Sequence, residues 1–134
     1  MRYVLAYAAT ALVMGGLDFL WLSRMGDTFY RGVIGEIMAR NPNMKAAIAF
    51  YLLYIVGVLW FAVRPALYDG DWRTALLNGA LFGFFAYATY DLTNMATLKV
   101  WSLQLTLVDM AWGTALTAVS ASAGALAAGL LNRA

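Results

Sequence analysis

The sequence predicts an all-α integral membrane protein, a four-helix bundle with a short amphipathic interfacial helix between the first two helices. Two observations predict this class. Of the 134 residues, 63% are hydrophobic and only 12% are charged, whereas soluble domains contain roughly 45–50% apolar and about 25% charged residues. Four segments also approach the roughly 20 apolar residues that cross a bilayer. We therefore expect a single transmembrane domain over residues 1–134.

The first predicted span covers residues 3–22 and holds one charged residue, Asp18. Because Arg2 precedes an apolar run, the N-terminus resembles a signal peptide. The run continues to Trp21 or Leu22, however, beyond the roughly 7–15 residues of a signal-peptide core. We therefore expect a retained first helix.

The segment after the first span predicts a short amphipathic helix over residues 28–40. Its apolar residues recur at helical spacing and its charged residues lie on the other side: Phe29, Tyr30, Val33, Ile34, Ile37 and Met38 against Arg31, Glu36 and Arg40. Asp27 is placed to cap this helix, and Asn41-Pro42 to end it. We expect such a helix to lie at the membrane surface.

The second and third spans differ in their polar content. The second, residues 46–63, is uncharged and is bounded by Lys45 and Arg64. The third, residues 74–94, carries Asp91 near its end. Only the third therefore contributes an acid at membrane depth.

The fourth span, residues 102–131, carries Asp109 close to its start. As a helix it would be about 45 Å long, whereas the hydrocarbon layer is about 30 Å thick. We expect it to tilt, to kink near its glycine-rich end, or to protrude.

Small residues at three- and four-residue spacing predict close approach between helices. They are Ala8, Ala11 and Gly15 in the first span, Gly79 and Gly83 in the third, and the run ASAGALAAG in the fourth. We expect these residues to serve helix packing.

Three acids are expected to share one leaflet of the membrane. Alternating spans put the end of the first helix, the end of the third and the start of the fourth at one face, so Asp18, Asp91 and Asp109 lie at similar depth. Helical stripes contain these acids or lie beside them, and the stripe on the first span is Ala11, Gly15, Asp18 and Trp21 or Leu22. The predicted ligand-binding set is Asp18, Tyr87, Tyr90, Asp91, Asn94, Asp109 and Trp112.

Charged residues at the centre of a membrane cost about 2.5–3.5 kcal/mol each, so three acids need compensation. Protonation of the acids is one way to reduce this cost, and both burial and mutual repulsion favour it. Arg24 and Lys99 lie near the same face and are the expected ion-pair partners. A third way to compensate the acids is a bound cation held by carboxylates and the Asn94 carbonyl.

The chain contains no cysteine and no histidine. This excludes disulfides, thiolate nucleophiles, haem ligation by His and the usual zinc sites, and we expect neither a metal nor another cofactor. No phosphate loop, nucleophile elbow or dinucleotide fingerprint occurs, and no basic patch indicates nucleic-acid binding. A reaction would rest on the carboxylates as general acid and base. The sequence does not indicate one, and catalytic residues stay unassigned.

Several blocks resemble domain-of-unknown-function family 2177, which consists of small bacterial predicted membrane proteins. They are LDFLWL in the first span, FYLLYIVGVLWFAVRPAL in the second, and GALFGFFAYATYDLTNMATLKVW continuing into LTLVDMAWGT in the third and fourth. The resemblance covers nearly the whole chain, and these blocks contain Asp18, Asp91, Asn94 and Asp109. It implies a multi-pass protein of the bacterial inner membrane in a setting of lipid metabolism, with no established reaction.

Three functions remain open from the sequence. In the first, the acidic pocket binds or moves a small amphiphile or lipid, with coupling to protons as an extension. The second is a lipid-modifying enzyme or its accessory subunit. The third is a structural or assembly subunit, in which the acids form salt bridges and interhelical hydrogen bonds. Membrane lipids are the expected partners, and a second copy or another membrane protein is an open alternative. Orientation and oligomeric state are not predicted.

Overall fold

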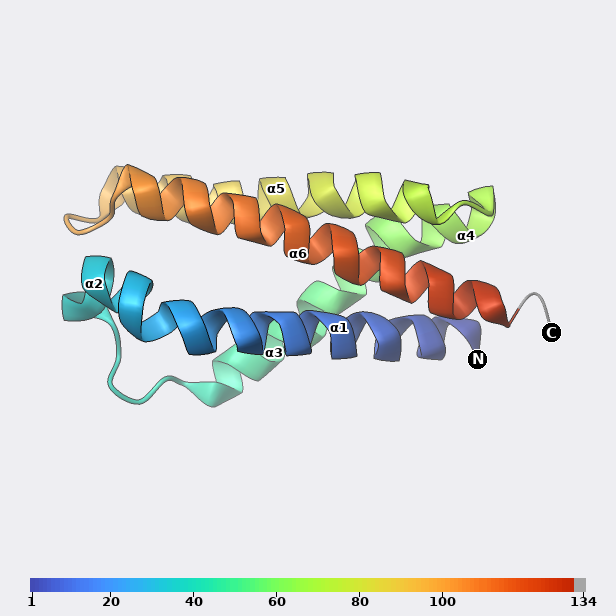
Figure 1. Cartoon of the computed structure of the whole chain (residues 1–134), viewed down its shortest axis with the longest axis horizontal. Coiled ribbons are helices and arrows are strands. Elements are labelled where there is room, and N and C mark those ends of the chain that lie inside the picture. The colour runs from blue at the N-terminus through green and yellow to red at the C-terminus, as the bar shows by residue number, and fades with distance from the viewer. Residues whose placement is uncertain (132–134) are drawn as a thin grey trace.

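The computed structural model describes residues 1–131, which form helices and no strand. The predicted all-α class is therefore confirmed. Three long helices lie alongside one another, and a fourth helical segment crosses behind them (Figure 1). The long helices are α1 (Arg2–Met25), α5 (Trp72–Thr97) and α6 (Leu103–Leu130), and the crossing segment is α3 (Met44–Val58), η3 (Leu59–Val63) and α4 (Arg64–Asp69).

The helical path of α1 continues beyond the expected end of the first span. It passes through a π-helical turn, a short α-helical piece and a 3-10 turn, which are η1 (Gly26–Tyr30), α2 (Arg31–Ile34) and η2 (Gly35–Ile37). The expected interfacial helix over residues 28–40 is thus a continuation of α1 that ends at Ile37. Asp27 does not cap it. The Asp27 carboxylate instead accepts a hydrogen bond from Arg31 Nε at 3.0 Å, one turn further on.

The second helix begins at an N-cap and ends at a glycine. Asn43 caps α3 by accepting a hydrogen bond from the Ala46 backbone N–H at 3.2 Å. The helical path then continues past Pro65, which closely follows the π-helical turn η3; such local adjustments accommodate proline inside a membrane helix. It ends at Gly70, whose φ of +71° is a conformation that costs residues with a Cβ. The helix is therefore longer than the span of residues 46–63.

The two last helices pack closely through glycines. A Cβ at Gly83 would lie 2.5 Å from the Gly113 carbonyl oxygen, and one at Gly79 would lie 2.9 Å from Ala121 Cβ. These distances are shorter than ordinary contacts, so only glycine permits this approach. The close packing predicted at Gly79 and Gly83 is confirmed.

The packed face of α1 differs from the one predicted. A Cβ at Gly15 would meet nothing within 4 Å, so the expected packing role of Gly15 is wrong, whereas Ala11 on the same stripe is half-buried against the core. The buried residues of α1 recur at every fourth position and are Ala6, Thr10, Met14 and Asp18. Gly124 of α6 packs on this face, because a Cβ there would lie 2.2 Å from Thr10 Oγ1.

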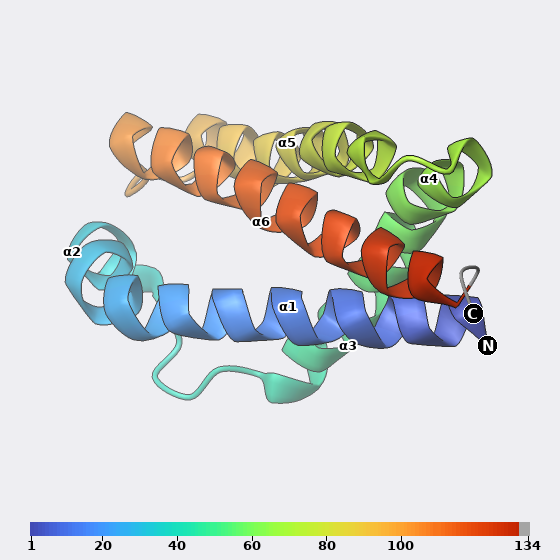
Figure 2. The same ribbon diagram turned by 45° about the vertical axis from the view of Figure 1, so that its right-hand side comes forward.

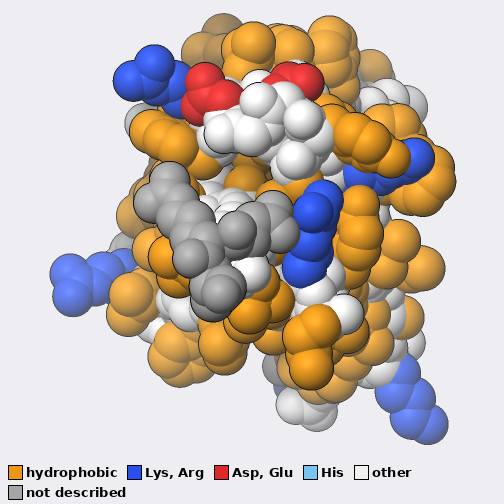
Figure 3. All heavy atoms as spheres, turned by 90° about the vertical axis from the view of Figure 1, so that its right-hand side faces the viewer, with side chains coloured by type: hydrophobic (Ala, Val, Ile, Leu, Met, Phe, Trp, Pro, Cys, Tyr) orange, Lys and Arg blue, Asp and Glu red, His pale blue; other side chains and the backbone are white. Residues whose placement is uncertain are grey.

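The outer surface is hydrophobic. Leu12, Leu53 and Phe85 are 77%, 72% and 64% exposed. Seen from the end that holds the N-terminus, basic side chains project at the rim, and hydrophobic side chains fill much of the surface between them (Figure 3). Lipid is the solvent that such a surface suits.

Three helical paths within residues 1–131 are long and apolar enough to cross a membrane, and they are Arg2–Ile37, Met44–Asp69 and Leu103–Leu130. Helix α5, with 26 residues, is as long as the shortest of these paths but less apolar. It packs along α6 over much of its length. That α5 also crosses the membrane stays a prediction.

Candidate functional site

A cavity of about 610 Å³ lies at the wide end of the bundle. Helices α1 and α6 converge near the N-terminus and separate toward α2 in both views (Figures 1 and 2). Large side chains line this end, since nine of the sixteen lining residues are aromatic: Trp21, Tyr30, Phe50, Tyr51, Tyr54, Tyr87, Tyr90, Trp101 and Trp112. Two carboxyl groups, from Asp18 and Asp109, complete the polar lining, which contains no Lys or Arg.

Asp18 joins three helices at one wall of the cavity. It lies on the buried face of α1 and is 6% exposed. One carboxyl oxygen accepts a hydrogen bond from Trp112 Nε1 of α6 at 3.0 Å, and the other accepts one from the Tyr51 hydroxyl of α3. Both donors are neutral, so they satisfy the oxygens of Asp18 without cancelling a charge.

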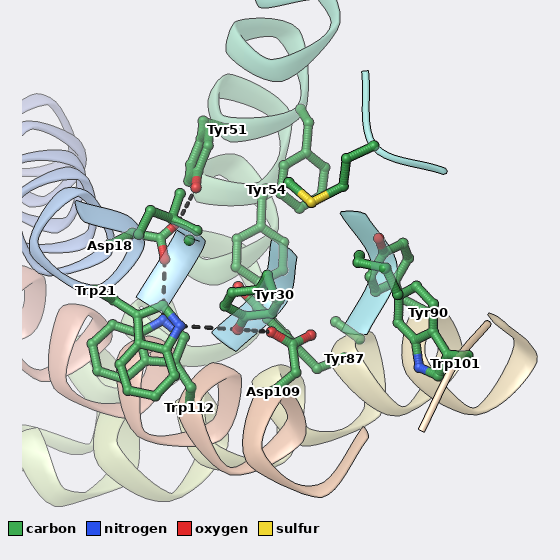
Figure 4. Close-up of a pocket in the computed structure, with 16 residues that line it drawn as sticks. Asp18, Trp21, Tyr30, Tyr51, Tyr54, Tyr87, Tyr90, Trp101, Asp109 and Trp112 are labelled. Carbon is green, nitrogen blue, oxygen red and sulfur yellow. Dashed lines mark hydrogen bonds between the residues drawn. The ribbon is translucent and has the colours of Figure 1, made fainter. Parts of the chain in front are cut away.

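Asp109, 8% exposed, lies on α6 at the other wall. It accepts a hydrogen bond from the Tyr30 hydroxyl at 2.6 Å, and that hydroxyl accepts one from Trp21 Nε1 at 2.9 Å. The Trp21 and Trp112 rings stack with centroids 4.3 Å apart and planes 6° from parallel. A continuous chain of contacts therefore links Asp18 to Asp109 through two indoles and a phenol (Figure 4).

Asp91 lies behind Asp109 and does not line the cavity. Its side chain is 0% exposed, and no donor among residues 1–131 contacts either of its carboxyl oxygens. Its carboxyl group interacts with that of Asp109. Two neighbouring carboxyl groups without a basic partner are accommodated when one carries a proton and donates it to the other.

The model of one protein family, described as a predicted membrane protein (DUF2177), matches residues 3–126. The chain belongs to the DUF2177 family. No curated protein and no solved structure matches this DUF2177 protein. Function must therefore be argued from the cavity itself.

The DUF2177 structure brings most of the predicted site residues together. Those that line the cavity are Asp18, Tyr87, Tyr90, Asp109 and Trp112. Asp91 and Asn94 lie outside it: Asp91 contacts Asp109, and Asn94 is half-buried one turn beyond Tyr90 on α5. Two of the three acids thus line the cavity, and the third lies outside it beside Asp109.

The basic residues expected beside these acids lie elsewhere. Arg24 and Lys99 are exposed, and the one salt bridge within residues 1–131 joins Arg31 to Asp27 on the surface. Arg24 follows Asp18 by six residues, which turns its side chain about 240° around the helix from that acid. Proximity in sequence did not therefore produce an ion pair. No set of three acidic side chains in the described part of the chain converges on a point that could hold a metal ion.

Two residues that line the cavity in this DUF2177 chain, Tyr30 and Tyr51, were not predicted from the sequence. Tyr51 was missed because the second span has no charge and so gave no polar signal. Tyr30 was treated as part of a surface helix, whereas it reaches Asp109 across 79 positions in the sequence. A usable signal existed, since a phenol within an apolar span needs a hydrogen-bond partner.

Proposed function

We propose that this protein binds a small amphiphile or lipid in the aromatic cavity, as a multi-pass protein of the bacterial inner membrane, and that binding is coupled to protons. The observation that carries the proposal is a cavity of about 610 Å³ whose carboxyl groups have no basic partner. Its volume falls in the range of small-molecule sites, about 300–1,000 Å³. Ionisable residues at membrane depth are costly and commonly mark binding or transport pathways.

The rim of the cavity suits an apolar tail. Leu22, Phe50 and Tyr90 line it and are 50%, 51% and 54% exposed. Since the outer surface is hydrophobic, these side chains would face lipid acyl chains. An amphiphile could place its headgroup at the acids and leave its tail in the bilayer.

Coupling to protons is supported by Asp91. Asp91 interacts with Asp109 directly behind the carboxyl group that a ligand would meet, and we propose that the two carboxyl groups share a proton. The other ionisable groups that face this pair are Asp18 from α1, Tyr30 from η1, and Tyr87 and Tyr90 from α5. A ligand that alters the charge on Asp109 must change the proton affinity of the pair, and the pair must change ligand affinity by the same factor.

One observation favours a second function, in which the polar residues only hold the bundle together. Asp18 accepts hydrogen bonds from two other helices, α3 and α6. Interhelical hydrogen bonds in membranes contribute about 0.6 kcal/mol on average. The structural function predicts that Asp18→Asn lowers thermal stability in detergent and changes no ligand content.

Native mass spectrometry of the protein in mild detergent separates these functions. We expect the wild type to carry a bound amphiphile or lipid and Asp109→Asn to lose most of it. Asp69→Asn removes an exposed acid at the opposite end and should leave the adduct unchanged. A wild type without any adduct, or an Asp109→Asn protein with the same adduct, would contradict the proposal.

The proposed coupling of binding to protons is tested by a separate titration. If the pair shares a proton, bound ligand measured across a pH series should vary in the wild type. The variation should be smaller in Asp91→Asn, whose amide donates a hydrogen bond to Asp109 without a titrating proton. Parallel pH profiles for the two proteins would exclude coupling through Asp91.

A further inference from the structure

The charge and lining of the cavity define a ligand class. We propose that the ligand is an organic monocation, an amine or quaternary ammonium group that carries an apolar tail. This rests on the proposed function, because it identifies the chemistry of the headgroup bound in the same cavity.

The charge of the cavity is the first argument. Asp18 and Asp109 line it, Asp91 lies directly behind Asp109, and no Lys or Arg lies among the lining residues. The hydrogen-bond donors to Asp18 and Asp109 are phenol and indole groups, which are neutral. An anionic headgroup would be repelled here, whereas a cation would supply the missing countercharge in a medium of low dielectric constant.

The aromatic rings are the second argument. Cations bind over the faces of Trp and Tyr rings within about 6 Å of the centroid, and quaternary ammonium groups are recognised in this way. Cation-π pairs within residues 1–131 all lie near the other end, as in Arg64 over the Trp60 ring at 4.3 Å. In the cavity, Tyr30, Tyr87 and Trp112 surround the space beside Asp109 (Figure 4). No cation of the described chain occupies these rings.

The arrangement suits an organic cation better than a metal ion. A small, strongly hydrated cation needs several oxygen ligands that converge on one point, and the acids within residues 1–131 do not converge in this way. A substituted ammonium group is weakly hydrated and spreads its charge over methyl or methylene groups. It can therefore contact rings on several sides while one carboxylate balances its charge.

The test compares three amphiphiles that share a decyl tail, with the full chain purified in a nonionic detergent. The probes are decyltrimethylammonium, its uncharged isostere with carbon in place of nitrogen, and decyl sulfate. Binding is followed by tryptophan fluorescence at equal probe concentration in the micelle. We expect decyltrimethylammonium to bind at least about tenfold more tightly than the isostere, and decyl sulfate not to bind.

Variants locate the effect at the acids. Asp109→Asn and Asp18→Asn should each weaken cation binding about tenfold or more while binding of the isostere stays unchanged. Glu36→Gln removes one exposed acid from the same end of the molecule, and it should bind the cation like the wild type. Thermal unfolding of each variant shows whether it is folded, and Trp112→Phe offers a second test that keeps both acids.

Each outcome bears on a different claim. Equal binding of cation and isostere, or preference for the sulfate, would overturn the ligand class and leave the proposed function standing. Binding of none of the probes would also overturn the ligand class, whereas the proposed function is decided by the adduct in native mass spectrometry. Lysophosphatidylcholine carries the same trimethylammonium group next to a phosphate anion. Binding as tight as that of decyltrimethylammonium indicates that a lipid headgroup is accepted, and weaker binding indicates a free organic cation.

Discussion

The Gly113→Ala substitution tests the link between helix packing and the cavity. A Cβ at Gly113 would lie 2.1 Å from Tyr87 Cγ and 2.2–2.4 Å from two further ring carbons. Carbon atoms normally approach to about 3.5–4.0 Å, so the ring must retreat by at least about 1.4 Å. Tyr87 lines the cavity, and the cavity is the space that can receive the ring. We expect a loss of about 1–3 kcal/mol in stability and weaker binding of decyltrimethylammonium.

Thermal and denaturant unfolding in detergent, followed by circular dichroism, measure this loss. Gly15→Ala is the control, since its Cβ meets nothing within 4 Å, and it should unfold like the wild type. Tyr87→Ala in the Gly113→Ala background completes a double-mutant cycle, in which the loss should be smaller than the sum of the single losses. A Gly113→Ala protein as stable as the control, or additive losses in the cycle, would refute this packing.

Three further predictions concern single contacts. Tyr30→Phe removes the donor to Asp109 and should cost about 0.6–1.7 kcal/mol in unfolding experiments. Tyr7→Phe, which loses an exposed hydrogen bond, should cost less, and equal losses would count against the buried contact. Asp91→Asn should keep its stability at neutral pH and show a flatter dependence of melting temperature on pH, and an unchanged slope would argue against a shared proton. Gly70→Ala forces a residue with a Cβ to φ near +71° and should cost about 1–2 kcal/mol, which the same unfolding assay measures.

The common depth of the three acids could be predicted because the position of a residue along a span fixes its height in the membrane. Asp18 and Asp109 line one cavity, and Asp91 contacts Asp109. Close approach at Gly79 and Gly83 was equally predictable, since small residues four positions apart lie on one helix face. Depth and periodicity therefore determined much of the candidate site.

Rotation of the helices about their own axes was not predictable. Gly15, on the small-residue stripe of α1, faces open space, and Thr10 and Met14 are buried instead. In a membrane protein, both the lipid-facing and the packed side of a helix are apolar, so hydrophobicity does not identify the packed side. The same ambiguity concealed Tyr51, because nothing in an uncharged span shows which phenol faces Asp18.

Photocrosslinking tests the central claim, that a ligand occupies the aromatic cavity, most directly. A decyl ammonium probe with a diazirine beside its nitrogen is irradiated with the purified protein, and the labelled residues are identified by mass spectrometry. The account predicts labels on cavity residues such as Tyr30, Tyr87 and Trp112, which disappear when excess decyltrimethylammonium is added. Labels confined to outer residues such as Leu12 and Leu53, and insensitive to that competitor, would contradict it.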